Sequence, residues 1–344
     1  MQAIHVPVHG PPSVLRVVDL PVPKPAAGEV LVKMIALSVN HLDLFVRGGM
    51  PGVKLPLPLI PGCDGTGEIV QLGEGVTHLR AGQKVMIEPG LSSGASAHDL
   101  AGNDHLSDDY QIRGEHCDGL AAEYVSILAR FAHPLPDGVD PVRVAAIPLV
   151  FLTAWGMLVT RANVRSGETV LVIGGSSGVG SAAIQIARDR GARVFATAGS
   201  EAKLRLAREL GADEVIDHTE AEWGQVVRKL TAGRGVDVVI EHVGPATWDT
   251  SMRVLARNGR LVTCGGTTGP KVSITLPHLI IKNQSVLGST MGPRNSFPTI
   301  LDRIAQGIYQ PVIDRVMPMS RVAEAHELLE NRQVSGKIVL IPGS

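Results

Sequence analysis

The chain has 344 residues, of which 44% are hydrophobic, and its 32 lysines and arginines nearly balance its 33 aspartates and glutamates. This length predicts about two domains with a substantial core, and the absence of a basic run leaves no footprint for a nucleic acid. Three cysteines, odd in number and far apart, argue against a disulfide framework and favour a reducing compartment.

The first residues, MQAIHVPVHGPPSV, do not show the charged-then-apolar pattern of a secretory leader. No apolar run reaches the roughly 18 residues that a membrane span needs. We therefore expect a cytoplasmic protein with small-molecule partners and no membrane or nucleic-acid partner.

The first part of the chain is rich in proline and glycine and contains segments that alternate like half-exposed strands. These are EVLVKMIALSVN, GTGEIVQLGEGV and GQKVMIEPG, separated by turn residues. Such alternation predicts antiparallel β-structure. The chain ends with the helix-like RVAEAHELLENRQ and the strand-like GKIVLIP, which are too short for a domain and are expected to return to an earlier one.

From Thr169 onward, short β-branched runs alternate with helical periods. The runs are TVLVIGG, RVFATAG, EVIDH, VDVVIEHVG, RLVTCGG and SVLGST. Strands that alternate with helices predict a parallel sheet, and strands without polar alternation predict that helices cover both faces. The expected fold class is α/β, with one doubly wound sheet of six strands.

A glycine-rich loop follows the first of these strands, in VIGGSSGVGSAAIQIA. Its glycines, Gly175, Gly178 and Gly180, stand between a buried strand and a helix start, where backbone N–H groups and the helix dipole hold a diphosphate. The strand–loop–helix context, with further strands and helices alternating after it, predicts dinucleotide binding. Glycines that serve only a tight turn stay open as the alternative. The loop residues expected to bind are Gly175, Ser176, Ser177, Gly178, Val179 and Gly180.

The end of the second strand bears on the choice of cofactor, because an acidic residue there binds the ribose hydroxyl of NAD. Ala198 occupies the expected position, followed by Gly199, Ser200 and Lys203, which offer donors and a cation to a phosphate. This pattern favours NADP. Two alternatives stay open: Ser200 and Lys203 also suit a helix cap and a solvated helix face, and Glu201 leaves NAD possible.

With the cofactor loop placed late, after a β-rich half, the whole chain resembles the medium-chain dehydrogenase/reductase superfamily, which includes zinc-type alcohol dehydrogenases and quinone oxidoreductases. The resemblance rests on PGCDGTGEIVQLGEG and GGSSGVG. It implies a GroES-like β domain over 1–126, completed by 300–344, and a Rossmann NAD(P)-binding domain over 127–299. It also implies a homodimer through the edge strand near SVLGST.

The resemblance also allows the two zinc sites of zinc-type members to be tested. The four structural cysteines of those members correspond to Ser93, Ser96, Asp99 and Ser107, and hydroxyls are poor zinc ligands, so turns and hydrogen bonds must order this loop. The catalytic ligands correspond to Asn40, Cys63 and Leu149, with Asp64 in place of the motif's glutamate. No zinc is expected. A rearranged site with Cys63, Asp64 and one of His41, His116 or Cys117 stays open as an alternative.

The candidate catalytic residues are Asn40, His41, Cys63 and Asp64. The amide of Asn40 can donate to a substrate oxygen or order the nicotinamide ribose, and His41 stands where alcohol dehydrogenases keep a basic residue near the diphosphate. Asp43 and Arg47 are expected to pair across a helical turn. Further cofactor contacts implied by the resemblance involve Thr153, His218, Val243, Gly244, Gly265, Gly266, Ser289, Thr290 and Lys337, the last at the phosphates.

Without a metal, alcohol oxidation lacks its Lewis acid, whereas hydride addition to a conjugated C=C bond or a quinone needs less activation. The sequence therefore predicts a zinc-independent, NADPH-dependent reductase of activated alkenes or quinones. Two alternatives stay open: an alcohol or aldehyde dehydrogenase that uses NAD(P), and a nucleotide-binding protein with a structural or regulatory role.

Overall fold

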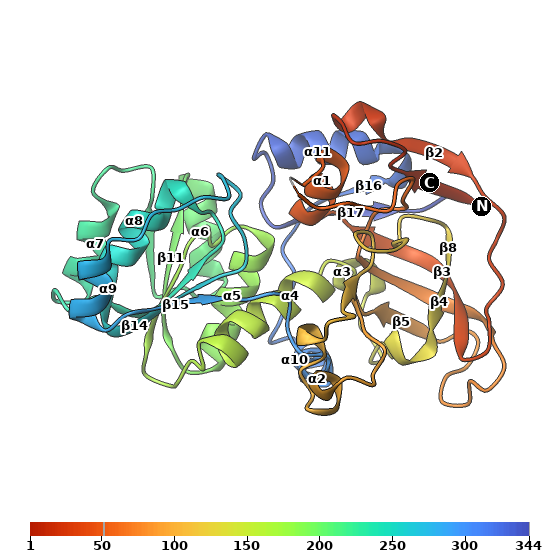
Figure 1. Ribbon diagram of the computed structural model, residues 1–344, viewed down its shortest axis with the longest axis horizontal. Coiled ribbons are helices and arrows are strands. Elements are labelled where there is room, and N and C mark those ends of the chain that lie inside the picture. Colours follow the sequence, from red (N-terminus) through yellow and green to blue (C-terminus); the bar gives the residue numbers. More distant parts are fainter. Residues whose placement is uncertain (51, 344) are drawn as a thin grey trace. The chain divides into compact units, whose positions relative to one another are not determined.

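The computed structural model describes residues 1–50 and 52–343 and divides the chain into two compact units (Figure 1). The first comprises Met1–Leu149 and Phe297–Ser344, and the second comprises Val150–Ser296. The expected first boundary at 126/127 therefore moves to 149/150, because residues 127–149 include strands that pair within the first unit. The second boundary lies three residues before the expected one. Within the described residues, no helix is both long and apolar enough to cross a membrane.

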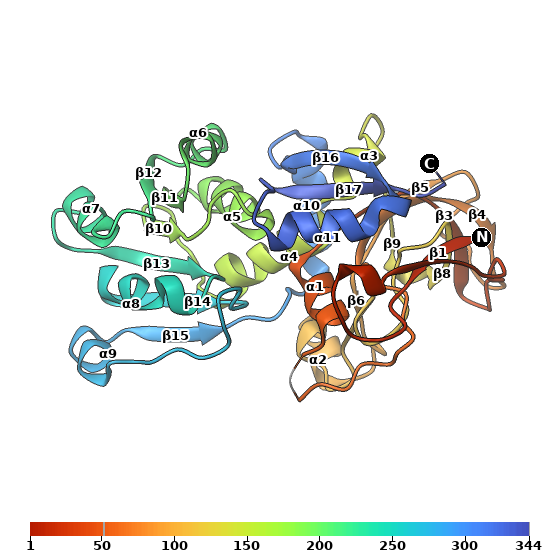
Figure 2. The same cartoon turned by 90° about the horizontal axis from the view of Figure 1, so that it is seen from above.

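The second unit contains a sheet of six parallel strands in the order β12-β11-β10-β13-β14-β15 (Figure 2). This order is that of a dinucleotide-binding fold, and the chain reverses direction along the sheet between β10 and β13. All six predicted strands are confirmed. Their bounds are β10 (Thr169–Val172), β11 (Arg193–Ala198), β12 (Glu214–Asp217), β13 (Val236–Glu241), β14 (Leu255–Thr263) and β15 (Ser285–Gly288).

Helices connect these strands and pack against them: α5 contacts β10 and β11, α6 contacts β11 and β12, and α8 contacts β13 and β14. Strand β10 is buried over its whole length, and its neighbours β11 and β13 are buried at all but one residue each, as the unbroken apolar runs predicted. The helices are α4 (Pro148–Trp155), α5 (Gly178–Asp189), α6 (Glu201–Glu209), α7 (Trp223–Leu230), α8 (Pro245–Val254) and α9 (Leu276–Lys282), with a π-helical turn at Gly156–Arg161 and a 3₁₀ turn at Arg294–Ser296.

The first unit contains a seven-stranded sheet with the order β16-β17-β3-β4-β5-β9, in which β8 also pairs with β3. The three alternating segments of the sequence form β3, β4 and β5, and their pairing is antiparallel as predicted. Two short ribbons, β1 with β2 and β6 with β7, complete the β-structure. The bounds are β1 (Gln2–His5), β2 (Arg16–Asp19), β3 (Glu29–Ser38), β4 (Asp64–Leu72), β5 (Lys84–Ile87), β6 (Gly90–Leu91), β7 (Gln111–Ile112), β8 (Tyr124–Leu128), β9 (Ala132–Pro134), β16 (Ile313–Pro318) and β17 (Lys337–Ile341).

The C-terminal segment returns to the first unit, as expected from its length. Strand β17 pairs with β3 through Val339 and Leu340, and α11 contacts α1. Met317, Leu329 and Leu340 join the same buried core as Val32 and Ile69. The helices of this unit are α1 (His41–Gly48), α2 (Ala97–Leu100), α3 (Pro141–Val144), α10 (Phe297–Ala305) and α11 (Val322–Glu330), with 3₁₀ turns at Pro12–Val14, Asp104–Leu106, Ala129–Phe131 and Met319–Arg321.

A close approach of two backbone segments positions the residues before β4. A Cβ atom on Gly119 would lie 2.2 Å from the carbonyl oxygen of Gly62 and 2.6 Å from that of Pro61. The N–H of Gly119 donates to the carbonyl of Ile60 at 2.7 Å, and the N–H of Leu120 donates to that of Gly62 at 2.8 Å. Glycine at 119 is therefore required for the segment that carries Cys63 and Asp64 to lie in this place.

We predict that Gly119→Ala lowers the free energy of unfolding by about 2 kcal/mol or more, because the methyl group would overlap rigid backbone atoms. Urea denaturation followed by circular dichroism measures the change. Gly48→Ala is the control, because its Cβ would meet no atom within 4 Å, and it should be neutral or stabilising. Equal stability of the two variants would contradict the packing argument.

Candidate active site

The glycine loop joins β10 to the N-terminus of α5, as predicted. A Cβ atom on Gly180 would lie 2.2 Å from the carbonyl oxygen of Gly174, so a side chain cannot be accommodated there. The hydroxyl of Ser177 caps α5 by accepting the N–H of Gly180 at 2.9 Å. The loop N–H of Gly175 donates to the carbonyl of Thr197 at 2.8 Å, which ties it to β11. The loop and helix start therefore fit a dinucleotide, since small residues leave backbone donors at the positive end of α5.

The loop after β13 is held by a fully buried carboxylate, Glu241, which sequence reasoning did not single out. Its Oε1 accepts the N–H groups of Val243 at 2.7 Å and Gly244 at 3.1 Å, and its Oε2 accepts the hydroxyls of Thr247 at 2.9 Å and Ser251 at 2.8 Å. Four donors thus fix the predicted cofactor residues 243 and 244. The EHVG motif shows an acidic residue at the end of a predicted strand, which could have indicated this role for Glu241. The hydroxyl donors on α8 could not be foreseen from it.

His242 connects this loop with the glycine loop. Its Nε2 lies 3.2 Å from the hydroxyl of Ser177, in hydrogen-bonding distance. Burial lowers the pKa of His242, so the imidazole is neutral near pH 7. The loops after β10 and β13, where the order of the strands reverses, are therefore joined directly.

The loops after β11 and β12 also meet. The Nδ1 of His218 lies 2.9 Å from the hydroxyl of Thr197, and a Cβ on Gly199 would lie 3.1 Å from its Nε2. The hydroxyl of Ser200 accepts the N–H of Lys203 at 3.4 Å, so Ser200 does cap α6. The capping alternative is confirmed, and it leaves the predicted phosphate contacts of Ser200 and Lys203 open.

The predicted cofactor residues of the second unit therefore come together from separate parts of the sequence. Almost all of them follow the carboxyl ends of the six parallel strands, which lie at one edge of the sheet. Thr153 comes from α4 instead, and its hydroxyl lies 3.9 Å from the sulfur of Met291, next to the predicted Thr290. Each role remains a prediction. The residues at the strand ends are Gly175–Gly180, Gly199, Ser200, Lys203, His218, Val243, Gly244, Gly265, Gly266, Ser289 and Thr290.

Four predicted residues and Ser38, which was not predicted, are buried together in the first unit, and we call them the polar cluster: Ser38, Asn40, Cys63, Asp64 and Lys337. Sheet pairing brings these residues together, since Ser38 stands opposite both Asp64 on β4 and Val339 on β17. The ammonium of Lys337 donates to Asp64 Oδ2 at 3.1 Å and to Asn40 Oδ1. Asp64 and Cys63 are fully buried, and Asn40 and Lys337 are 4% exposed.

The carboxylate of Asp64 is the acceptor at the centre of the polar cluster. Its Oδ2 accepts the hydroxyl of Ser38 at 3.0 Å and the amide of Asn40 at 2.8 Å, besides the ammonium of Lys337. Its Oδ1 accepts the backbone N–H of Leu149 at 2.6 Å. Leu149, predicted to stand at a ligand position, thus contributes a main-chain donor.

The amide of Asn40 is committed within the same cluster. Its Nδ2 donates to Asp64 and, at 3.4 Å, to the sulfur of Cys63, while its oxygen accepts the ammonium of Lys337. These contacts use both N–H groups and the oxygen. Asn40 is therefore arranged to position its neighbours, and the predicted donation to a substrate oxygen would require it to break one of these bonds.

Two other expectations for this region concern Lys337 and His41. The predicted contact of Lys337 with cofactor phosphates stays a prediction, and its ammonium is engaged with Asp64 in this structure. His41 is the first residue of α1 and is exposed, whereas the polar cluster is buried. The catalytic role proposed for His41 stays a prediction.

The expected pairing of Asp43 with Arg47 is wrong. Arg47 instead extends to α11, where it pairs with Glu330 and lies 3.3 Å from Nδ1 of His326. Asp43 accepts the backbone N–H groups of Asn40 at 2.7 Å and Gly62 at 3.1 Å. Backbone donors therefore engage Asp43 in place of Arg47, and Asp43 joins the two segments that carry Asn40 and Cys63.

A zinc ion does not fit the polar cluster. Burial, together with the neighbouring Asp64 and Asp43, raises the pKa of the Cys63 thiol well above its usual value, and the metal ligand is the thiolate. Asp64 is already neutralised by Lys337, and an amide is a weak zinc ligand. In the described parts of the chain, no group of three or more histidine, cysteine, aspartate or glutamate side chains is arranged to hold a metal ion. Cys63, Cys117 and Cys264 are all free thiols.

Hydrogen bonds join three of the four loop positions that correspond to the structural zinc ligands, namely Ser96, Asp99 and Ser107, and the N–H of the fourth, Ser93, donates to Asp109 at 3.0 Å. The hydroxyls of Ser96 and Ser107 lie 2.8 Å apart. The hydroxyl of Ser107 lies 2.5 Å from a carboxylate oxygen of Asp109 and 3.4 Å from one of Asp99, and its single proton can be donated to either. Asp99 further accepts the hydroxyl of Ser92 and the N–H of Ser96. The hydrogen bond from Ser92, with those from Ser96 and Ser107, lowers the pKa of Asp99 to about 2. The expectation that hydrogen bonds order this loop agrees with these contacts.

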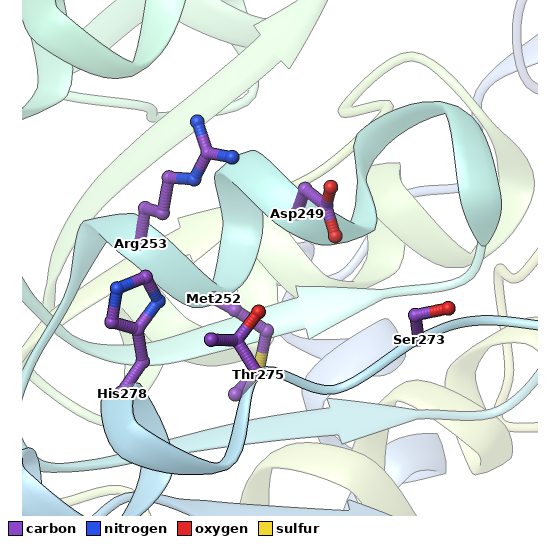
Figure 3. A pocket seen from close by; sticks show the side chains of 6 residues that line it. All are labelled: Asp249, Met252, Arg253, Ser273, Thr275 and His278. Atoms are coloured by element: carbon purple, nitrogen blue, oxygen red, sulfur yellow. The ribbon is translucent and has the colours of Figure 1, made fainter.

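The second unit also has a small surface recess between α8 and the segment that leads into α9 (Figure 3). It shares no residue with the predicted cofactor site, and we do not include it in the candidate site. Its lining residues are Asp249, Met252, Arg253, Ser273, Thr275 and His278.

The titration of Asp43 provides a test of this geometry. Burial raises its pKa from 3.8 to about 6, although the N–H groups of Asn40 and Gly62 and the ammonium of Lys337 lower it. Because the folded pKa lies above the unfolded one, the stabilisation from protonated Asp43 is complete below pH 3.8 and is lost as the pH rises through about 6. We predict that Asp43→Asn removes up to about 3 kcal/mol of this decline in unfolding free energy.

The measurement is the unfolding free energy at several pH values between about 4 and 7, obtained by urea denaturation. The unfolding free energy of Asp43→Asn must change less with pH than that of the wild type. The exposed Asp137 provides the control, since Asp137→Asn should leave the dependence unchanged. Parallel curves for Asp43→Asn and the wild type would contradict the raised pKa.

Comparisons with known proteins agree with both units. Residues 26–137 match the family model of the alcohol dehydrogenase GroES-like domain, and residues 178–306 match that of the zinc-binding dehydrogenase. A quinone oxidoreductase of Rattus norvegicus is 32% identical over 99% of this chain and 98% of its own length. An NAD-dependent alcohol dehydrogenase of Sulfolobus acidocaldarius is 32% identical over 95% of this chain and 96% of its own.

Among solved structures, a crystal structure of an NAD-dependent alcohol dehydrogenase is 44% identical, covers 100% of both chains and superposes with a TM-score of 0.97. These similarities extend over the whole chain and include both the β-rich unit and the dinucleotide fold. They identify an NAD(P)-dependent oxidoreductase. The chain belongs to the medium-chain dehydrogenase/reductase superfamily.

Proposed function

We propose that this oxidoreductase is a zinc-independent, NADPH-dependent reductase of an activated C=C bond or a quinone. The observation that supports this most is the buried ammonium of Lys337, which is bound to Asp64 and Asn40 within the polar cluster. The ammonium of Lys337 already balances the carboxylate of Asp64, and burial raises the pKa of the Cys63 thiol. A metal ion would have to displace the ammonium or deprotonate a buried thiol.

The residues at the carboxyl edge of the second unit would hold the dinucleotide. Backbone N–H groups of the glycine loop bind anionic oxygens, and Ser177 and Glu241 keep this loop and the loop after β13 in place. When bound, the dihydronicotinamide supplies a hydride to the substrate. The chain's part is to bind and orient both reactants and to exclude water around them.

The cofactor preference follows from the loops after β11 and β12. Strand β11 ends at Ala198, and the next residues offer a hydroxyl at Ser200 and a cation at Lys203, while His218 lies against Gly199. A 2′-phosphate would find donors here, and β11 itself ends in an alanine and not in a carboxylate. Asp217 at the end of β12 and Glu201 are the nearby acidic residues that would oppose it. Relatives named as NAD-dependent point the other way, so both cofactors need to be compared.

The substrate class follows from the chemistry that remains without a Lewis acid. Hydride addition to a conjugated alkene or quinone places charge on an oxygen through conjugation, which lowers the demand for an electrophile. Oxidation of an unactivated alcohol needs an alkoxide and hence stronger activation. The quinone oxidoreductase relatives support the first class, and the alcohol dehydrogenase relatives make the second the main rival.

The first measurement combines metal content with turnover. We expect the purified protein to contain well under one zinc per chain and to oxidise NADPH faster than NADH in the presence of a small enone or quinone. Mass spectrometry measures the metal, and the loss of dihydronicotinamide absorbance measures turnover. A chelator should leave the rate unchanged.

One variant tests the cofactor preference separately. Lys203→Ala should reduce the ratio of kcat/KM for NADPH to that for NADH by roughly tenfold, since one charge-assisted contact is lost. Lys229→Ala, on the last turn of α7, is the matched control.

Two outcomes of the metal and turnover measurements would contradict the proposed function. Stoichiometric zinc with chelator-sensitive aldehyde turnover would establish the alcohol dehydrogenase instead. Tight NADPH binding without turnover of any substrate would favour a structural or regulatory nucleotide-binding protein.

We also propose that two copies associate through the outer edge of β15 and through α9. Strand β15 is the last strand of the six-stranded sheet, so its outer edge could pair with another strand if Arg161, which donates to the carbonyl of Gly288 at 2.8 Å, moves aside. Beside it, α9 exposes Leu276 at 61%, Ile280 at 70% and Ile281 at 65%. A continued sheet with apolar helices on it would bury both features at once.

Light scattering after size-exclusion chromatography tests this association. The wild type should have twice the chain mass of 36.3 kDa. We predict that Ile280→Glu shifts the protein towards the monomer, because a carboxylate would be buried at the contact. Leu100→Glu, at an 81% exposed position in the first unit, should remain dimeric. A monomeric wild type, or a dimer that tolerates Ile280→Glu, would exclude this interface.

A further inference from the structure

The polar cluster of the first unit holds a buried cation of its own. Lys337 is 4% exposed, and its ammonium contacts Asp64 Oδ2 at 3.1 Å and Asn40 Oδ1. Cys63 Sγ lies 3.4 Å from Asn40 Nδ2, and Ser38 Oγ lies 3.0 Å from Asp64 Oδ2. Oxygen and sulfur atoms that could surround a cation are therefore gathered around an ammonium from the last strand of the chain.

The charges in this pocket explain why the ammonium is needed. A fully buried carboxylate without a counter-ion is costly, and breaking a buried pair leaves an uncompensated charge. Asp64 and Lys337 together are neutral. A divalent ion would add two positive charges beside the ammonium, and the charge of Asp64 is already balanced.

We propose that Lys337 excludes a divalent metal ion from the polar cluster, because its ammonium occupies the oxygen atoms that the ion would bind and already balances the charge of Asp64. In this respect Lys337 is a positioning residue: it fixes the amide of Asn40 and the carboxylate of Asp64 in the arrangement seen here. The proposal concerns metal affinity, and it does not depend on which substrate the enzyme reduces.

The geometry offers a way to build a competing metal site. The Asn40 side chain lies within 3.4 Å of Cys63 Sγ and 2.8 Å from Asp64 Oδ2. Asn40→Cys would place a second thiol beside the first thiol and the carboxylate. Two thiolates and a carboxylate are a suitable set for Zn²⁺ or Co²⁺. If the proposal is right, the ammonium of Lys337 weakens the binding of a metal ion to this designed site.

The experiment compares Co²⁺ binding by the full-length protein in four forms: the wild type, N40C, N40C/K337M and N40C/K337R. Titration under anaerobic, reducing conditions follows the thiolate-to-cobalt charge-transfer band and the visible bands of tetrahedral Co²⁺. We expect N40C/K337M to bind one Co²⁺ at least about tenfold more tightly than N40C. N40C/K337R, which retains the positive charge, should resemble N40C, and the wild type should show no saturable binding.

Two further variants guard the interpretation. N40C/K282M removes another partly buried lysine, whose ammonium donates to the carbonyls of Arg253 and Leu255 at 3.0 Å in the second unit, and it should bind Co²⁺ like N40C. N40C/K337Q replaces N40C/K337M if the latter fails to fold, since an amide still donates to Asp64 but carries no charge. Circular dichroism verifies the fold of each variant.

Three outcomes would overturn the proposal. They are equal Co²⁺ affinity of N40C and its uncharged Lys337 variant, absence of Co²⁺ binding in all variants, and stoichiometric binding by the wild type with a charge-transfer band that C63S abolishes. None of these readouts uses catalytic activity. A failure of enone or quinone turnover would therefore refute the proposed function and leave this comparison intact.

Discussion

The buried ion pair between Lys337 and Asp64 is the interaction on which the first unit's site depends. The two residues are 273 positions apart, and they meet because β17 returns from the end of the chain to pair with β3, which also pairs with β4. Until β17 is in place, Asp64 and Asn40 lack their cation. A buried carboxylate of this kind couples the arrangement of the polar groups to the completion of the sheet, since leaving it unpaired is costly.

The second unit relies on a different constraint, which is mostly carried by the backbone. Six parallel strands end at one edge, and the loops there present N–H groups and small residues. The side chains that matter most, such as Glu241 and Ser177, bind backbone donors and hold the loops still. A site built on backbone geometry tolerates many side chains, and this is why its glycine loop was the clearest signal in the sequence.

The difference explains what could and could not be predicted from the sequence. The six strands of the second unit and three strands of the first followed from local periodicity. The glycine loop followed from its place between a strand and a helix, whereas most other carboxyl-edge residues came from the resemblance, and their contacts with a cofactor stay predictions. The partner of Lys337 was not foreseen, because nothing near position 337 indicates that its ammonium meets Asp64. The pairing of Arg47 with Glu330 was also missed, because the sequence offers a nearer partner, Asp43. In the structure Asp43 is buried and accepts backbone N–H groups instead, and Arg47 pairs with a residue far along the chain.

The two places where zinc-type members of the superfamily hold metal differ here in how charge is balanced. In the loop around Ser96, Asp99 and Ser107, hydroxyl and backbone donors surround partly exposed carboxylates. Water can solvate the negative charge that these donors do not stabilise. Hydrogen bonds suffice there. At Asp64 no solvent is available, and neutral donors alone would leave a full negative charge in the core. An ammonium group therefore has to come from within the chain, and the pairing of β17 with β3 delivers it.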